Sequence, residues 1–140
     1  MSTASALPAD NLISCFNEST TDCVKVLDTD AMILSFNPAG YEIMEIDDPS
    51  MAIGADWLTF WKGEQGIKAQ RAFNDAKTGK LGYFEGESPT MRGNMKWWQV
   101  TIVPLKNSHN DIEWILVMSR DVTELHDLRS ENKALKLKLT

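Results

Sequence analysis

The amino-acid sequence predicts an α+β fold built on an antiparallel sheet. Strand-like segments gather towards the two ends of the 140-residue chain, and mostly helical segments lie between them. Short polar stretches join neighbouring strand-like segments, as antiparallel hairpins require. Strands and helices that are segregated in this way are typical of α+β proteins. The length fits one domain with one hydrophobic core.

The N-terminal part is predicted to contain a strand hairpin between two short helices. Residues 1–20 are interpreted as a tail with a short helix. Residues 23–28 alternate as a strand does, and residues 32–36 follow a polar turn as its partner. Asn37 then has the side chain of an N-cap, and Pro38 suits the first position of a helix.

Two more helical segments are predicted in the middle of the chain. Asp56 is placed to cap a short aromatic turn over residues 57–61. Residues 64–77 form a longer helix, and Thr78 and Gly79 mark its end. The inward side of this helix is expected to carry Ile67, Phe73 and Ala76.

Three strands are predicted in the last part of the chain. Residues 83–87 are expected to form a short edge strand, and residues 95–104 alternate well. A polar loop over residues 107–111 leads to a strand at 112–119. Residues 114–118 of that strand are an unbroken apolar run, which predicts that both of its faces are covered.

A C-terminal amphipathic helix is predicted to follow the last strand directly. Asp121 is expected to be its N-cap, and Glu124 stands three residues later, where it would complete a capping box. The helix then carries a heptad a/d stripe of Leu125, Leu128, Asn132, Leu135 and Leu139. An Asn at an a position pairs well across a parallel two-stranded seam, so we expect a homodimer. The alternative is that the stripe folds back onto its own sheet.

Composition and charge narrow the class of protein. Twenty acidic and 14 basic residues give a net charge of −6, which disfavours direct nucleic-acid binding. The two cysteines, Cys15 and Cys23, form no metal-ligand pattern and suggest reduced, cytosolic use. No signal peptide or transmembrane stretch is visible, so we expect a cytoplasmic protein that does not bind a membrane.

Several short motifs occur in the order and spacing of a known family. They are residues 26–30, 36–39, 53–54, Trp97 or Trp98 with Pro104, and 120–124. Together they resemble the PAS domain, although Val122 stands where that family's final motif has Ile. The resemblance implies a five-stranded antiparallel sheet of order 2-1-5-4-3, with helices on one face and a sensory or dimerisation role. We therefore expect a PAS domain over residues 21–121 and a coiled-coil or linker helix over 122–140.

The resemblance also allows familiar cofactors to be checked. Members that bind flavin covalently need a Cys on the short helix, and residues 54–61 contain none. Haem-binding members use a His on the long helix, and residues 64–77 contain none. His109 and His126 are expected to be solvated. Haem and covalent flavin are thus disfavoured, whereas noncovalent flavin or another small molecule remains open.

An aromatic set makes a ligand cavity conceivable. The candidate ligand-binding residues are Phe36, Asn37, Tyr41, Trp57, Trp61, Phe73, Trp98 and Trp114. The alternative is that these side chains simply fill the core. Because the set is nearly all apolar, we expect any ligand to be neutral or aromatic.

Two functions follow from these features. The first is a sensory module of bacterial-type signalling that relays a ligand-induced change through Asp121, Thr123 and Glu124 to the C-terminal helix. A kinase, cyclase or transcription regulator is then the expected downstream effector. The alternative is a ligand-free interaction or dimerisation module of a larger regulator. No catalytic or metal-binding set is visible, so we do not expect an enzyme.

Overall fold

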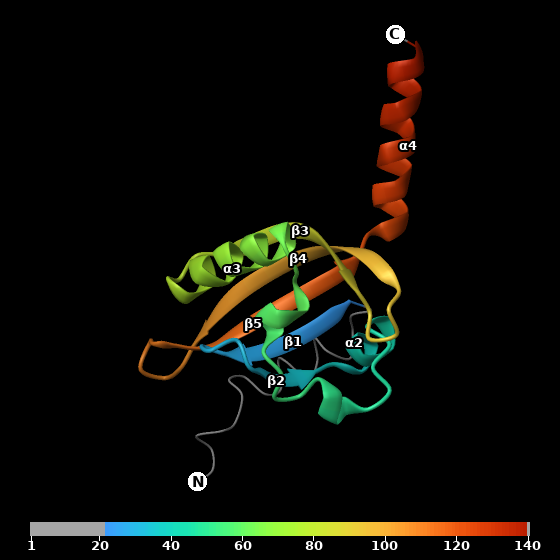
Figure 1. The fold of residues 1–140 in the computed structure, drawn as a ribbon. Helices are drawn as coiled ribbons and strands as arrows, with labels where there is room; N and C mark the ends of the chain where they lie inside the picture. Colours follow the sequence, from blue (N-terminus) through green and yellow to red (C-terminus); the bar gives the residue numbers. More distant parts are fainter. Residues whose placement is uncertain (1–21, 140) are drawn as a thin grey trace.

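The computed structural model describes residues 22–139, and its centre is a five-stranded antiparallel sheet of order β2-β1-β5-β4-β3 (Figure 1). The strands are β1 (Cys23–Asp28), β2 (Ile33–Phe36), β3 (Gly82–Pro89), β4 (Met95–Lys106) and β5 (Ile112–Asp121). This order confirms the fold class that the PAS resemblance implied. The predicted N-terminal helix lies outside the described residues.

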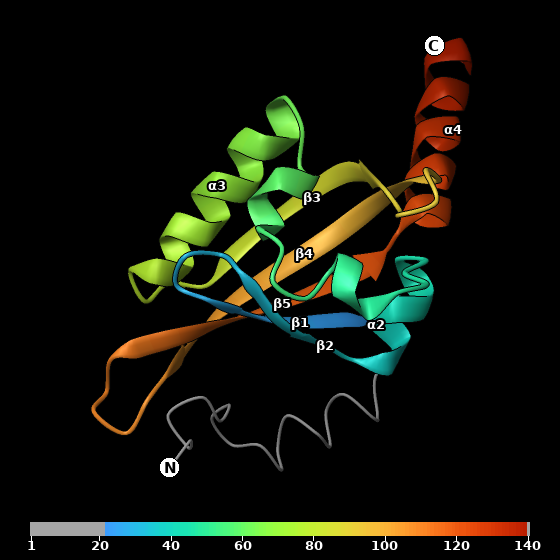
Figure 2. The same cartoon turned by 60° about the horizontal axis from the view of Figure 1, so that its bottom comes forward.

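Helices and turns cover one face of the sheet (Figures 1 and 2). They are α2 (Pro38–Ile43), η2 (Pro49–Met51), η3 (Trp57–Phe60) and α3 (Glu64–Lys77). Helix α4 (Thr123–Leu139) follows β5 and extends away from the sheet (Figure 1). The core lies between α3, η3 and the sheet, and its largest fully buried side chains include Trp57 and Trp98. Within residues 22–139, no helix has the length and apolar composition needed to cross a membrane.

Asn37 confirms its prediction as the N-cap of α2 and also ties α2 to the sheet. Its Oδ1 accepts hydrogen bonds from the backbone N–H groups of Gly40 (3.0 Å) and Val24 (2.8 Å). Its Nδ2 donates to the backbone oxygen of Asp22 at 2.8 Å. The side chain is fully buried, so these partners replace the water that its polar atoms would otherwise bind.

The bounds of α3 agree with the prediction, but its buried side differs in one residue. Phe73 and Ala76 are buried as expected, whereas Ile67 is 56% exposed and its predicted inward position is wrong. Phe73 lies six positions after Ile67, which places the two side chains about 120° apart around the helix axis. Phe73 faces the sheet together with small alanines, so Ile67 must face solvent.

Strand β5 is longer and less completely covered than predicted. It pairs along most of its length with both β1 and β4, which makes it the central strand. Ile115, Val117 and Ser119 are buried on the side of the core, but Leu116 and Met118 on the other face are only half-buried. Trp114 on that second face is buried, so the predicted cover of both faces holds at this residue and is only partial at Leu116 and Met118.

Candidate functional site

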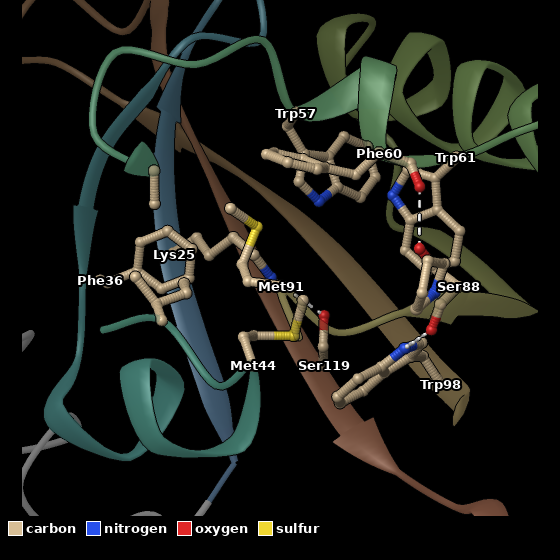
Figure 3. Close-up of a pocket in the computed structure, with 13 residues that line it drawn as sticks. Lys25, Phe36, Met44, Trp57, Phe60, Trp61, Ser88, Met91, Trp98 and Ser119 are labelled. Carbon is tan, nitrogen blue, oxygen red and sulfur yellow. Dashed lines mark hydrogen bonds between the residues drawn. The ribbon is translucent and has the colours of Figure 1, made fainter. Parts of the chain in front are cut away.

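A cavity of about 30 Å³ lies between the sheet and the segments that cover it (Figure 3). Thirteen side chains line it: Lys25, Phe36, Met44, Ile46, Ala52, Trp57, Phe60, Trp61, Ser88, Pro89, Met91, Trp98 and Ser119. A cavity of this size has room for ordered water. A flavin does not fit a cavity of this size, because pockets for such ligands are roughly ten times larger.

Half of the predicted ligand-binding residues line the cavity. Phe36 comes from β2, Trp57 from η3, Trp61 from the residue after η3, and Trp98 from β4. Trp57 and Trp61 lie edge to face, with ring centroids 5.9 Å apart. The fold thus brings together four of the predicted aromatic residues from three separate parts of the chain.

The other four predicted residues lie away from the cavity. Asn37 caps α2, and Tyr41 stacks on the ring of Phe36 with 5.1 Å between the centroids. Phe73 packs in the core beside Trp57. Trp114 lies near the start of β5, opposite Asp28 and Leu105. Asn37, Tyr41 and Phe73 thus have side-chain contacts that explain their positions without a ligand.

Lys25, the one ionisable side chain among the described residues that line the cavity, was not among the predicted ligand-binding residues. This side chain is only 3% exposed, and its Nζ lies 3.3 Å from Ser119 Oγ and 5.4 Å from the centre of the Phe36 ring. The alternation of β1 does not reveal this position, because Val24 and Val26 on the opposite face are as buried as Cys23 and Leu27. The expectation of a neutral ligand rested on a nearly apolar set of residues that did not include Lys25.

Cys23, which is also in phase with Lys25, does not line the cavity. It is a free thiol and is fully buried. Burial raises the pKa of this thiol, although the nearby Lys25 ammonium opposes the shift. Since the thiolate is the reactive form, Cys23 is expected to be chemically inert at neutral pH.

A short loop closes one side of the cavity. Met91 belongs to the turn between β3 and β4, lines the cavity and is itself partly exposed. Its backbone N–H donates to the backbone oxygen of Met44 at 3.0 Å. The Glu45 carboxylate accepts hydrogen bonds from the side chains of Thr90 and Asn94, and these bonds lower the pKa of that carboxyl. The loop is therefore attached to the end of α2.

Two adjacent tryptophans of β4 connect the cavity to α4. The Trp98 side chain lines the cavity, and its Nε1 donates to the backbone oxygen of Ser88 at 3.0 Å. Trp97 accepts a backbone hydrogen bond from Val122 (2.9 Å), and its own N–H donates to Thr123 Oγ1 (3.0 Å). One β4 segment thus contacts both the cavity and the start of α4.

His126 adds a further contact to the junction, which is the contact of Trp97 with residues 122–126 at the start of α4. Its side chain was expected to be solvated, but it is half-buried. Its ring stacks on the Trp97 ring, with centroids 3.9 Å apart and planes 13° apart. The side chain is half-buried, and its Nδ1 has no hydrogen-bond partner within residues 22–139. The first turn of α4 is therefore held against β4 by a ring contact as well as by backbone hydrogen bonds.

Asp121 stabilises the start of α4, but not as the predicted N-cap. It is the last residue of β5, opposite Trp98, and the cap position falls on Val122 because α4 begins at Thr123. Its Oδ1 still accepts from the Thr123 N–H (3.0 Å) and Oγ1 (2.6 Å), and Oδ2 accepts from Lys96 Nζ (2.9 Å). Glu124 is then too close to the cap for a capping box, so that prediction is wrong.

We expect Asp121→Ala to lower the free energy of unfolding by about 1 kcal/mol at neutral pH. Burial by itself would raise the pKa of the Asp121 carboxyl, but hydrogen bonds from Thr123 and Lys96 lower it. A lowered folded-state pKa means that the stabilisation is present above about pH 4, the unfolded value, and is lost as pH falls through the folded value.

Hydrogen exchange across residues 122–128 measures this effect, with Glu131→Ala on the exposed part of α4 as the control. Faster exchange in Asp121→Ala alone, and a stability difference that shrinks in acid, are the expected results. Unchanged protection in Asp121→Ala would rule out this role for the carboxylate.

Helix α4 projects away from the sheet, so the alternative in which it folds back is not what the structure contains (Figures 1 and 2). Leu125, Leu128 and Leu135 are 45%, 54% and 57% exposed. Asn132 is exposed as well, and the side chain of Leu139 lies outside the described residues. The predicted stripe is thus uncovered within residues 22–139, and the dimer stays a prediction.

The sheet order, the covered face and the cavity define a domain of the PAS type. A model of the PAS fold family matches residues 18–127, so the chain belongs to that family. A search of curated proteins finds no match.

Solved structures agree with the family assignment. The PAS domain of a Colwellia psychrerythraea protein has a TM-score of 0.71 at 16% identity, covering 82% of this chain and 97% of that chain. The PAS domain of an HTR-like protein from Haloarcula marismortui has a TM-score of 0.61 at 20% identity, covering 80% of this chain and 93% of that one.

A larger structure matches over more of the chain. It is an RNA-binding light-oxygen-voltage receptor, with a TM-score of 0.77 at 13% identity. The match covers 94% of this chain but only 39% of the receptor. At these identities the similarity concerns the fold alone.

Proposed function

We propose that this PAS domain is a cytoplasmic sensory module that binds a small molecule in its cavity and transmits the change to a dimer formed by α4. The observation that carries the proposal is the pair Trp97 and Trp98. Trp98 forms part of the cavity wall, while its neighbour Trp97 binds Val122, Thr123 and His126 at the start of α4. A shift of this β4 segment would therefore change the contacts that hold the first turn of α4.

Ser119 supplies a second connection along β5. Its hydroxyl accepts a hydrogen bond from Lys25 inside the cavity. Asp121 lies two positions further along β5, and α4 starts at Thr123, four positions after Ser119. The proposed effector is a kinase, cyclase or transcription regulator acting after α4, and the module itself is proposed to have no enzymatic activity. The ligand acts by favouring one of two arrangements of the junction.

The second candidate is a ligand-free PAS module that dimerises or holds a partner. The small volume of the cavity favours it, because about 30 Å³ leaves no room for an organic ligand without movement of the lining side chains. In this alternative the exposed leucines of α4 still form an interface, but the cavity residues only stabilise the fold.

Trp98→Phe separates these candidates. The variant keeps an aromatic ring but loses the N–H bond to the Ser88 oxygen, so the cavity wall loosens. We expect faster hydrogen exchange at the amides of Val122 and His126, which hydrogen-bond to Trp97 and Val122 in the junction.

Phe73→Leu is the matched control, because Phe73 is in the same core but does not line the cavity. It should lower global stability without a selective change in residues 122–128. Equal changes in both variants would favour the ligand-free module.

A further inference from the structure

We infer that the ligand of this cavity is a small organic anion, a carboxylate with a short apolar or single-ring body, whose charge pairs with Lys25. The inference rests on the proposed function, because it names the ligand class of the same cavity. It replaces the neutral ligand that the aromatic composition had suggested.

The first support is the charge of Lys25. The side chain is 3% exposed, and its Nζ has the Ser119 hydroxyl at 3.3 Å, the Phe36 ring at 5.4 Å and the neutral thiol of Cys23 as its neighbours. No carboxylate of residues 22–139 forms an ion pair with it. A buried ammonium without a counter-charge is strongly destabilising, so an anion from solution gains a large part of its binding energy here.

The second support is an excess of hydrogen-bond donors over acceptors. The buried Nε1 of Trp61, a cavity residue, has no hydrogen-bond partner in the described part of the chain. The Ser88 hydroxyl is already used, because it donates to the Phe60 backbone oxygen at 2.8 Å. The lining contains no Asp or Glu. A ligand that satisfies Lys25 and Trp61 must therefore supply acceptors.

The third support concerns size and entry. Figure 3 shows Met44 and Met91 beside the ammonium group of Lys25, where their side chains take up the space between the sheet and the loop. Methionine is unbranched and changes rotamer easily, so these two side chains can move aside for a small body. The aromatic rings around them favour a ring or a short alkyl chain as that body.

The test compares benzoate with benzyl alcohol, a neutral molecule of similar shape, by calorimetric titration of the whole chain. Wild-type protein, Lys25→Met and Lys106→Met are titrated in parallel. Lys25→Met keeps the length of the side chain and removes its charge, and Lys106→Met removes an exposed charge at the end of β4.

We expect benzoate to bind the wild type and Lys106→Met alike, and to bind Lys25→Met about ten- to a hundredfold more weakly. Benzyl alcohol should bind all three proteins weakly and equally. The amide signals of Ser119 and Trp98 should shift on benzoate addition, which places the ligand in the cavity.

Benzyl alcohol binding that equals benzoate binding in the wild type would overturn the anionic ligand but leave the cavity as a binding site. Absence of binding by either probe would overturn this inference together with the ligand-binding part of the proposed function. Benzoate binding that is equal in the wild type and Lys25→Met would show that the charge is not used. If Lys25→Met does not fold, the comparison of the two probes in the wild type still decides the question.

Discussion

The double variant Leu128→Lys with Leu135→Lys is expected to be monomeric at concentrations where the wild type is a dimer. Both leucines are more than half exposed on α4 and occupy d positions of its heptad stripe. An isolated helix of this length is marginally stable in water, so the stripe needs a partner surface. A parallel pairing places each d position beside its twin, so four lysines would meet in one seam.

The matched control is Ser130→Lys with Leu137→Lys. These positions are also seven residues apart on α4 but lie at the f positions, on the side of the helix opposite the seam. Analytical ultracentrifugation of the three proteins should show dimer, monomer and dimer, respectively. A monomeric wild type at tens of micromolar, or a d-position variant that still dimerises, would contradict the seam.

Asn37→Ala is expected to cause a large loss of stability, because the buried Asn37 side chain connects α2 to β1. The change removes the acceptor of the Val24 and Gly40 amides and the donor to the Asp22 oxygen, all at 2.8–3.0 Å. Gly40 N–H keeps a bond to the Asn37 backbone oxygen, so the loss is not complete. We expect about 2–4 kcal/mol, since each buried group left without a partner costs about 1–3 kcal/mol.

Urea denaturation measures this loss, with Asn74→Ala as the control. Asn74 is on the exposed side of α3, where its side chain accepts a bond from Gln70. Its removal should change stability by less than about 0.5 kcal/mol. A similar small change in Asn37→Ala would mean that water replaces the lost partners, and that Asn37 does not lock α2 to β1.

Local signals predicted the ends of several elements correctly because their causes are local. Asn37 followed by Pro38 begins α2 with a side-chain cap, and Asp56 caps η3 through the Leu58 N–H at 3.0 Å. Gly79, with φ of 94°, follows the end of α3. In each case the chemistry of a few adjacent residues decides the backbone conformation.

The incorrect predictions concern positions whose structure depends on contacts with residues distant in the sequence. Asp121 belongs to β5 because Trp98 of β4 pairs with it, which moves the start of α4 to Thr123. Ile67 is exposed because α3 presents its alanines and Phe73 to the sheet. A cap or a hydrophobic residue has several possible positions in a sequence, and only tertiary pairing selects one of them.

The sequence predicted several aromatic residues of the candidate site but not its polar residues. Large aromatic residues are rare enough to attract attention, and Phe36, Trp57, Trp61 and Trp98 do meet. A lysine between two valines of a strand is usually interpreted as exposed, and the burial of both faces of β1 at Lys25 is a tertiary effect that the local sequence does not show. The contact of Trp97 with His126 joins residues 29 positions apart, and no local pattern points to it.

The relay from cavity to dimer is tested most directly by the dimer dissociation constant of Trp98→Phe, measured by sedimentation equilibrium beside the wild type and Phe73→Leu. If the cavity wall and α4 are coupled, a change in one must alter the equilibrium of the other. We predict a dissociation constant that differs from the wild type by about fivefold or more in Trp98→Phe and is unchanged in Phe73→Leu. The same dissociation constant in all three proteins would contradict the relay.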